Sequence, residues 1–314
     1  MTPRRKFLAN FAALSAVSMV WPAGRALADI RSFDFSPEQR GRLRAQKNPA
    51  AVRLLSNGYR FVEAGVLTVA VAPFAAPLAS YATDARTIVG SDPDYAQLVA
   101  DALGLKLAFV PVAWPDWPLG LASGKYDAVI SNVGVTEQRK QKFDFTTYRL
   151  GLHAFYVPVV SAIQSIHEPK DISGLRIITG SGTIQERILL EWNKQNISHG
   201  LKEASLQYFD DLDSASLALL SNRADVIFNP HAPLAYAAAT QGKIRLVGTV
   251  NAGWPLRADV AIASRKGAGL AQALTEATNG LIAGGRYQAA LARWGLETEA
   301  IEHSETNPPG YKDA

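Results

Sequence analysis

One stretch of the sequence, Tyr126–Arg139, places small side chains and a single arginine after the start of an apolar strand. The residues Ala128–Ile130 favour a buried strand, and Thr136 is a typical cap for a helix that holds Arg139 in its first turn. Free N–H groups and the dipole at a helix start attract anions. A guanidinium beside them can hold a carboxylate through two parallel hydrogen bonds. The pattern predicts a site for a small carboxylate; the alternative is a solvated surface arginine beside Lys140.

A second polar cluster is expected in the later half of the chain. The turn Gly180–Thr183 lies between a predicted strand and a predicted helix. The N–H groups of Gly182 and Thr183 can form an anion-binding nest, although a plain strand-to-helix turn explains the same residues. Asn229 and His231 follow the apolar strand at 226–228 and offer polar contacts to a ligand. A structural or surface role for His231 stays open.

Three aromatic residues lie where a ligand could stack. Trp114 and Trp117 follow the end of an expected strand, and Phe74 lies in the long loop Pro73–Gly90. An indole or phenyl ring there can stack on a ligand or hold a cation. Packing within the core is the alternative for each ring. Long loops inside compact domains are often functional, which favours Phe74 as a ligand contact.

Motifs for catalysis or for a bound metal are missing from the sequence. No Gly-x-Ser-x-Gly elbow, phosphate-binding loop or dinucleotide fingerprint occurs, and cysteine is absent. The five histidines are scattered without the spacing of metal ligands. The acidic cluster at 210–213 is interpreted as the solvated start of a helix. We therefore expect no cofactor, no metal and no enzymatic activity.

The first 28 residues are interpreted as a cleaved secretory signal peptide. A basic start with Arg4 and Arg5 precedes a short apolar run, and the small-x-small pattern predicts cleavage after Ala28. The paired arginines resemble a twin-arginine export signal, although Pro3 leaves the general route open. A transmembrane anchor is the alternative, but the apolar run is short for a bilayer.

Removing this leader changes the charge of the chain. The leader holds four of the 32 basic residues and no acidic one, so 28 basic residues face 28 acidic ones in the mature chain. The pI of about 9.2 is therefore largely a property of the leader. A mature chain of balanced charge gives no support for binding to nucleic acid or to a membrane surface.

Strands alternate with helices from Val66–Val71 onward, which indicates an α/β fold with mainly parallel sheets. Asp92 is expected to cap the next helix, with Pro93 at its first position. The alternation restarts in the later half and predicts two similar α/β lobes. Because ligands bind beyond the carboxyl ends of such strands, we expect the site in a cleft between the lobes. Residues 29–61 are predicted to form a surface arm and 297–314 a polar tail.

The chain resembles the periplasmic solute-binding proteins of polar amino-acid ABC transporters, family 3 of the extracellular solute-binding proteins. The resemblance covers about 65–296, and its motifs stand in the family's order. They are GVLTVAV at 65–71, GSDPDYAQLVADALGLKLAFVPVAW at 90–114, LASGKYDAVISNVGVTEQRKQKFDFT at 121–146, GSGTIQE at 180–186 and AGGRYQAALARWGL at 283–296.

The resemblance implies roles for individual residues. Arg139 would bind the ligand α-carboxylate, joined by the N–H groups of the Gly182-Thr183 turn. Asn132 would offer its main-chain carbonyl to the ligand ammonium, and the stacking ring falls on Trp114.

Two positions depart from the family pattern. Gly134 stands where a serine or threonine is usual, and Asn229 stands near the place of the aspartate that pairs with the α-ammonium. A small organic carboxylate is therefore better supported than a standard L-amino acid.

The resemblance also implies two Rossmann-like α/β lobes joined by two crossing strands, the periplasmic binding protein fold. We place the crossings near Tyr156–Val160 and Gly248–Leu256. The first lobe would be 62–155 plus 257–296, and the second 156–256. The expected mechanism is hinge closure around the ligand in a monomer, which then docks on an ABC permease in the inner membrane.

Three functions are compatible with these residues. The first is a periplasmic component of an ABC importer that captures a small carboxylate-bearing ligand, an amino acid or a derivative. The second is a periplasmic dehydratase-like enzyme of the same fold acting on prephenate-like acids, which needs a carboxylic acid or histidine in the cleft as general acid. The third is an accessory protein of another exported system.

Overall fold

The computed structural model describes residues 33–55, 58–256 and 258–312, which belong to one compact unit, 31–314. The predicted signal peptide, its twin-arginine motif and its cleavage after Ala28 lie outside the described residues. In the part of the chain that is described, no helix has the length and apolar character needed to cross a membrane.

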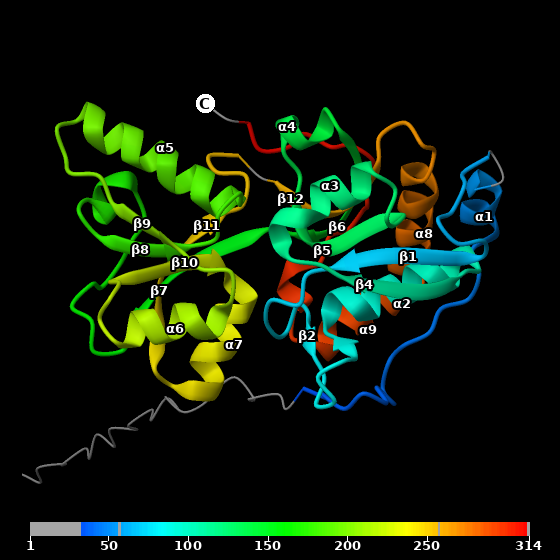
Figure 1. Ribbon diagram of the computed structural model, residues 1–314, viewed down its shortest axis with the longest axis horizontal. Helices are drawn as coiled ribbons and strands as arrows, with labels where there is room; N and C mark the ends of the chain where they lie inside the picture. The colour runs from blue at the N-terminus through cyan, green and yellow to red at the C-terminus, as the bar shows by residue number, and fades with distance from the viewer. Residues whose placement is uncertain (1–32, 56–57, 257, 313–314) are drawn as a thin grey trace, which may run out of the picture. The chain divides into compact units, whose positions relative to one another are not determined.

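The first lobe is built on a five-stranded sheet in the order β4-β1-β5-β12-β6 (Figure 1). Its strands are β1 (Val66–Val71), β4 (Lys106–Pro111), β5 (Ala128–Gly134), β6 (Phe143–Leu150) and β12 (Asp259–Arg265). A separate two-stranded sheet joins β2 (Ser80–Tyr81) to β3 (Ile88–Val89). Every residue of β1 is buried, as expected for a strand covered on both faces.

Helices cover both faces of this sheet. They are α1 (Pro49–Leu55), α2 (Ser91–Leu103), α3 (Trp117–Ala122), α4 (Glu137–Lys140), α8 (Ala271–Ala283) and α9 (Arg286–Arg293), with the short 3₁₀ turns Trp114–Asp116 and Glu297–Glu299. Alternate residues of β1 divide between two clusters, as the pleat of a strand requires. Leu67 and Val69 pack with α2, α8 and α9, whereas Ala70 packs with Trp117 of α3.

The second lobe is built on a sheet in the order β11-β7-β10-β8-β9. Its strands are β7 (Leu152–Pro158), β8 (Arg176–Thr179), β9 (Ser205–Tyr208), β10 (Val226–Pro230) and β11 (Ile244–Asn251). Its helices are α5 (Ile184–Ser198), α6 (Leu212–Leu220) and α7 (His231–Gln241), after a 3₁₀ turn at Pro169–Ile172. α5 covers one face, and α6 and α7 cover the other (Figure 1). Two α/β lobes confirm the predicted fold class.

Both sheets are mixed, which corrects the prediction of mainly parallel sheets. In the first sheet β1 runs parallel to β4 and β5, but β12 is antiparallel to β5 and β6. In the second sheet β8 runs parallel to β9 and β10, but β7 is antiparallel to β10 and β11. The antiparallel pairs arise where the chain changes lobes, since β7 and β12 directly follow the crossings.

The first crossing lies at Gly151, upstream of the predicted Tyr156–Val160. β6 ends in the first sheet at Leu150, and β7 begins in the second at Leu152. Tyr156 pairs with strands on both of its sides, so the predicted position was wrong. Only glycine fits at position 151, because a Cβ would lie 2.5 Å from the Ala252 Cβ of the other crossing. The second crossing falls within 252–258, between β11 and β12.

Both segments outside the predicted lobes pack on the first lobe. The arm includes α1, which the sequence pattern did not predict, and its apolar side chains lie on the core of the first lobe. The tail is held by hydrogen bonds to the first lobe, which its polar composition does not indicate. The Ser304 hydroxyl, for example, donates to the Thr147 carbonyl at 2.6 Å. Tyr311 N–H donates to the Val135 carbonyl, directly ahead of α4. The tail thus supports the loop that carries Arg139.

Candidate functional site

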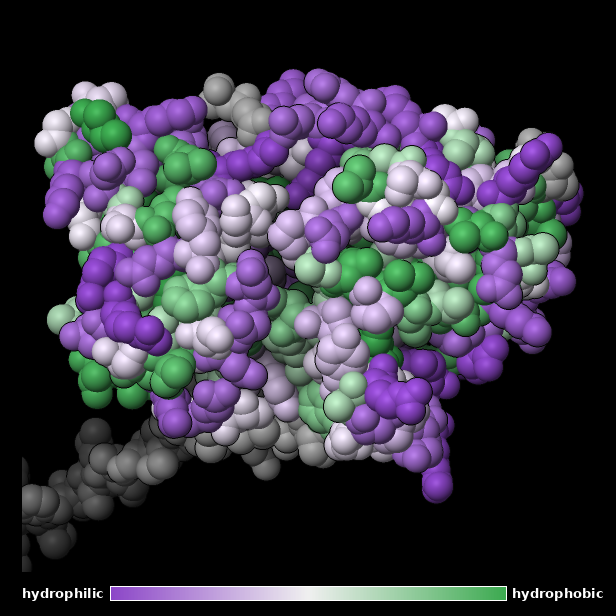
Figure 2. All heavy atoms as spheres, in the orientation of Figure 1, coloured by the Kyte–Doolittle hydropathy of each residue, from purple (hydrophilic) through white to green (hydrophobic). Residues whose placement is uncertain are grey.

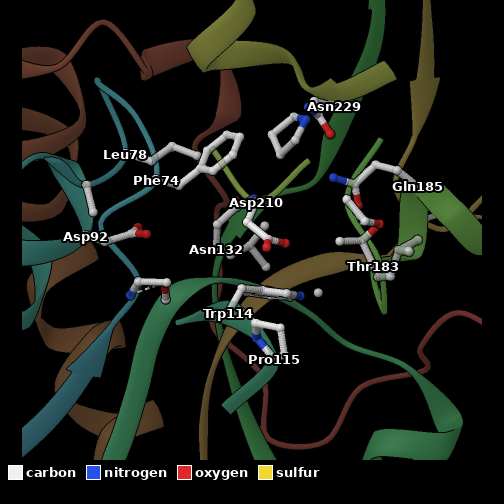
Figure 3. A pocket seen from close by; sticks show the side chains of 18 of the residues that line it. Phe74, Leu78, Asp92, Trp114, Pro115, Asn132, Thr183, Gln185, Asp210 and Asn229 are labelled. Carbon is white, nitrogen blue, oxygen red and sulfur yellow. Dashed lines mark hydrogen bonds between the residues drawn. The ribbon is translucent and has the colours of Figure 1, made fainter. Parts of the chain in front are cut away.

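A cavity of about 280 Å³ lies between the two lobes, at strand ends of both sheets (Figure 3). In the close view, Phe74, Leu78 and Asp92 face Thr183 and Gln185 across it. Seven of the ten predicted site residues line this cavity: Phe74, Trp114, Asn132, Gly134, Arg139, Thr183 and Asn229. The other three, Trp117, Gly182 and His231, are not part of its lining.

Arg139 is positioned by the local structure that its sequence predicts. Thr136 caps α4, and its hydroxyl accepts the Arg139 N–H at 3.0 Å. The exposed surface around α4 is hydrophilic (Figure 2), but the Arg139 guanidinium turns inward to the cavity. It donates to the carbonyls of Gly134 at 2.9 Å and of Gly182 at 3.1 Å. Because these carbonyls belong to different lobes, Arg139 bridges the cleft.

The electrostatic surroundings of Arg139 suit an anion. Burial, with a smaller contribution from the nearby Arg187, lowers the pKa of Arg139 to about 10. Within the described ranges its guanidinium donates to main-chain carbonyls and forms no ion pair with a carboxylate. The guanidinium carbon lies 5.7 Å from the Trp114 ring centre and 5.6 Å from that of Trp117. A half-buried cation without a carboxylate partner among the described residues is stabilised by a carboxylate that enters the cavity.

The start of α5 provides the second-lobe wall. Thr183 caps this helix by accepting the Glu186 N–H at 3.1 Å, as a strand-to-helix turn should. The Gly182 N–H is occupied by the Glu186 carboxylate at 2.6 Å, so Gly182 contributes its carbonyl to Arg139 rather than a donor to a ligand. The first N–H groups of a helix have no partner within it, so the α5 start still favours an anion.

Ile184 gives a physical reason for the unusual Gly134. A Cβ at position 134 would lie 2.3 Å from the Ile184 Cδ1 of the opposite lobe. The place that a serine or threonine side chain takes in the family pattern is therefore filled by an apolar contact between the lobes.

Two of the predicted aromatic residues line the cavity, and the third belongs to the core of the first lobe. Trp114 and Phe74 line the cavity. Trp117 is buried in the first lobe and packs on Phe143 with ring centres 5.1 Å apart, so its role is mainly core packing. Its ring still faces the Arg139 guanidinium.

Of the two polar residues predicted at the end of β10, only one lines the cavity. Asn229 is buried and lines the cavity near its second-lobe end. His231 begins α7 and lies beside Tyr156, with its Nδ1 3.5 Å from the hydroxyl. Burial lowers the pKa of His231. The structural interpretation therefore fits His231, and a ligand contact fits Asn229.

Asp92 is the most informative cavity residue that sequence reasoning missed. It was expected to cap α2, but α2 begins at Ser91 with Gly90 as its cap, and Asp92 turns its carboxylate to the cavity (Figure 3). Only glycine fits at position 90, because a Cβ there would meet the Leu78 carbonyl at 2.3 Å. Asp92 is 1% exposed; Tyr148 donates to its Oδ1 at 2.8 Å, and Oδ2 has no partner among the described residues. Burial raises its pKa despite the nearby Arg149.

A buried ion pair stands behind this part of the wall. Arg149 pairs with Glu299 of the tail and donates to the Asn132 side-chain oxygen. Burial alone would lower the pKa of Arg149, but Glu299 and the neighbouring acidic groups raise it overall. Asn132 has a φ of 52°, in the left-handed region that asparagine tolerates. Arg149 therefore holds Asn132 in place at the cavity wall.

His153 and Asp210 also line the cavity without having been predicted to do so. His153 is 5% exposed, and neither ring nitrogen has a hydrogen-bond partner within the described ranges. Burial, followed by the charge of Arg149, lowers its pKa to about 3, so the imidazole is neutral. Asp211 caps α6 as the acidic cluster predicts, but its neighbour Asp210 faces the cavity. No His, Cys, Asp and Glu cluster suited to a metal occurs among the described residues.

Comparison with known proteins places this architecture in a defined group. The sequence model of "Bacterial extracellular solute-binding proteins, family 3" matches residues 67–297. A probable histidine-binding protein of Campylobacter jejuni is 29% identical over 140 residues, which cover 45% of this chain and 51% of that protein. The L-cystine-binding protein TcyJ of Escherichia coli is 27% identical over 222 residues, 69% of this chain and 78% of that protein.

Two further similarities bear on function. A cyclohexadienyl dehydratase of Pseudomonas aeruginosa is 34% identical over 87 residues, 28% of this chain and 32% of that enzyme. Among solved structures, an ancestral arginine-binding protein bound to arginine superposes with a TM-score of 0.65 and 26% identity. That match covers 76% of this chain and 99% of the ancestral protein.

Proposed function

Because this chain belongs to family 3 of the bacterial extracellular solute-binding proteins, we propose that it captures a small carboxylate-bearing ligand in the cavity between its lobes. The ligand is an amino acid or an amino-acid derivative. Relatives named for binding histidine, cystine and arginine support this class. The protein acts in the periplasm as the exported component of an ABC importer, delivering its ligand to a permease of the inner membrane as a monomer.

The observation that carries this proposal is the half-buried guanidinium of Arg139, which faces the cavity. It lines the cavity, contacts both lobes and has main-chain carbonyls as partners. A ligand carboxylate beside it replaces the hydration that burial removes, and the start of α5 adds N–H donors of favourable polarity. Trp114 forms an adjacent apolar wall on which the ligand body can pack.

The cation of the ligand is placed at Asp92 in this proposal. Asn229 is uncharged and cannot form an ion pair with an ammonium, whereas Asp92 offers an unpartnered carboxylate oxygen to the same cavity. Arg149 and Glu299 neutralise each other behind the wall, so the charge of Asp92 is left for a ligand to balance. An amino acid with a second cationic group, or a derivative whose amine is not on the α-carbon, could pair its carboxylate with Arg139 and its cation with Asp92.

Closure of the two lobes about the crossings would bury the ligand. The chain passes between the sheets at Gly151 and within 252–258, and both segments contribute to the cavity floor through Gly151 and Ala252. Short connections at two neighbouring points favour a hinge. We accordingly divide the lobes at 151 and near 252–258 instead of at 155 and 256.

A ligand screen by tryptophan fluorescence tests the proposal, since Trp114 lines the cavity. L-arginine, L-histidine, L-cystine and L-glutamine are compared with opines, N-modified amino acids and plain carboxylic acids. The same titrations are made with Arg139→Ala, Asp92→Asn and, as a control, the exposed Arg223→Ala.

We expect Arg139→Ala to weaken every hit by about a hundredfold or more, because one member of a buried charge pair is lost. Asp92→Asn should weaken only ligands with a cationic group, and Arg223→Ala should leave binding unchanged. Near-wild-type affinity in Arg139→Ala would refute the site assignment.

A dehydratase-like activity is a second candidate, favoured by the chemistry of Asp92. Burial raises the pKa of this carboxyl, and a buried carboxyl with a raised pKa can act as a general acid toward a substrate in the cavity. The partial similarity to a cyclohexadienyl dehydratase points the same way. Incubation with prephenate-like acids, followed by ultraviolet absorbance and mass spectrometry, tests it. Turnover that Asp92→Asn abolishes would support an enzymatic function. An absence of turnover would rule out this activity and leave ligand binding as the function.

A further inference from the structure

The described start of the chain is anchored firmly on the first lobe. Asp94 of α2 accepts hydrogen bonds from the Arg42 Nε at 2.7 Å and from the Trp294 Nε1 at 2.8 Å, and it also pairs with Arg293. Arg293 in turn donates to the Gln39 side-chain oxygen at 2.8 Å. The Asp94 side chain is nearly fully buried, so these charge-assisted bonds are strong.

From this anchor, two aromatic rings reach the second lobe. Phe33 lies between Trp294 of the first lobe, with ring centres 5.2 Å apart, and Tyr236 of α7, on which it stacks at 4.9 Å and an interplanar angle of 27°. Phe35 contacts the same two rings at 6.2 and 6.5 Å. Tyr236 belongs to a helix that packs on β7, β10 and β11 of the second sheet.

We propose that residues 33–42 form a clasp between the lobes, which holds the lobes in the arrangement of this structure through the stacking of Phe33 and Phe35 on Tyr236 and resists their opening. The clasp lies ahead of residue 67, where the match to the family model begins, so it is an addition to the part of the chain that matches the family. The inference relies on the hinge movement of the proposed function, but it needs no assumption about the ligand.

The contacts of the clasp determine how strongly it shifts the equilibrium between open and closed lobes. Opening about the crossings moves α7 away from Trp294 and α2, and the clasp is fixed to α2 and α9 by its polar anchors. Opening therefore separates Tyr236 from both phenylalanine rings. An aromatic pair of this kind shifts an equilibrium by roughly twofold to tenfold, so loss of the Tyr236 ring should raise the ratio of open to closed molecules by a similar factor. A ligand that requires closure would bind correspondingly more weakly.

Distances between spin labels on the two lobes measure this bias without any ligand. The chain contains no cysteine, so Lys142→Cys and Lys194→Cys give two unique labelling sites. Both positions are exposed, one after α4 in the first lobe and the other on α5 in the second. Pulsed electron–electron double resonance is recorded on three versions of the labelled protein. They are the otherwise wild-type chain, the Tyr236→Ala variant, and the Tyr236→Phe variant, which keeps the ring and serves as the matched control.

We expect Tyr236→Ala to move the distribution to longer distances and Tyr236→Phe to leave it unchanged. The double variant Phe33→Ala with Phe35→Ala removes the other side of the contact without altering α7, and it decides the matter if Tyr236→Ala fails to fold. Distributions that match the labelled wild type in folded Tyr236→Ala, or in the double variant, would overturn the clasp. A failure of the ligand screen would not affect this result, so the two proposals can fail separately.

Discussion

Replacing His153 by leucine should reduce the acid sensitivity of the fold. The imidazole is buried, unpartnered within the described ranges and close to the positive Arg149, and its pKa is lowered from 6.5 to about 3. The folded chain therefore keeps His153 neutral under conditions in which the unfolded chain takes up a proton. The resulting stability is present above about pH 6.5 and is lost as the pH falls toward 3.

The size of the effect follows from the two pKa values. Between about pH 6 and pH 4 only the unfolded imidazole binds a proton, so the free energy of unfolding falls by about 1.4 kcal/mol for each pH unit. Over the interval from about pH 6.5 to pH 4.5 the loss reaches roughly 2 kcal/mol. Carboxylates contribute their own dependence near the lower limit, so the difference between wild type and variant is the quantity to use.

Urea unfolding followed by tryptophan fluorescence measures this difference. His153→Leu should show a loss smaller by roughly 2 kcal/mol between the two pH values, while its stability at neutral pH is unchanged or higher, because an unpartnered polar group has been removed. The exposed His167 supplies a control for the loss of a surface histidine, in the variant His167→Leu. Equal pH dependence in His153→Leu and wild type would refute the claim that the imidazole is held neutral.

Three other substitutions test buried contacts of the protein by urea unfolding. Arg149→Met should cost roughly 3–5 kcal/mol because the Glu299 carboxylate is left buried without its partner, and adding Glu299→Met should recover most of it; a double variant no more stable than the single one would contradict this. Gly134→Ala should cost at most about 1 kcal/mol, because its Cβ meets the Cδ1 at the end of the Ile184 side chain, which can rotate away, and Ile184→Ala should relieve this cost; a larger cost that Ile184→Ala leaves in place would contradict this reading of the contact. Asp127→Asn should cost at least about 2 kcal/mol, since its carboxylate accepts the N–H groups of residues 62 and 68; a smaller loss would show that water replaces these bonds.

The parts of the site that depend on local sequence were predictable. The apolar run at 66–71 is β1, and the Thr136 cap places Arg139 in the first turn of α4. Gly180–Thr183 is the turn that starts α5. In each case the determining contacts lie within a few residues, so propensity and capping rules are sufficient.

The parts that depend on distant contacts were not predictable. Asp92 faces the cavity instead of capping α2, which begins at Ser91 after a glycine that packs on the Leu78 carbonyl, and no capping rule contains this contact. The first crossing falls at Gly151, between two strands that follow each other without a loop, at the point where Ala252 of the second crossing approaches it. The contact of Phe33 with Tyr236 joins residues two hundred positions apart, and no local pattern of either segment indicates it.

The central claim is that Arg139 anchors a ligand carboxylate in the cavity between the lobes. Calorimetric titration of the tightest ligand from the screen, and of the same compound with its carboxylate converted to an amide, tests it most directly. We expect the amide to bind at least about a hundredfold more weakly to the wild type, and Arg139→Ala to remove most of this difference. Equal affinity of the acid and its amide for the wild-type protein would show that Arg139 does not bind the ligand carboxylate.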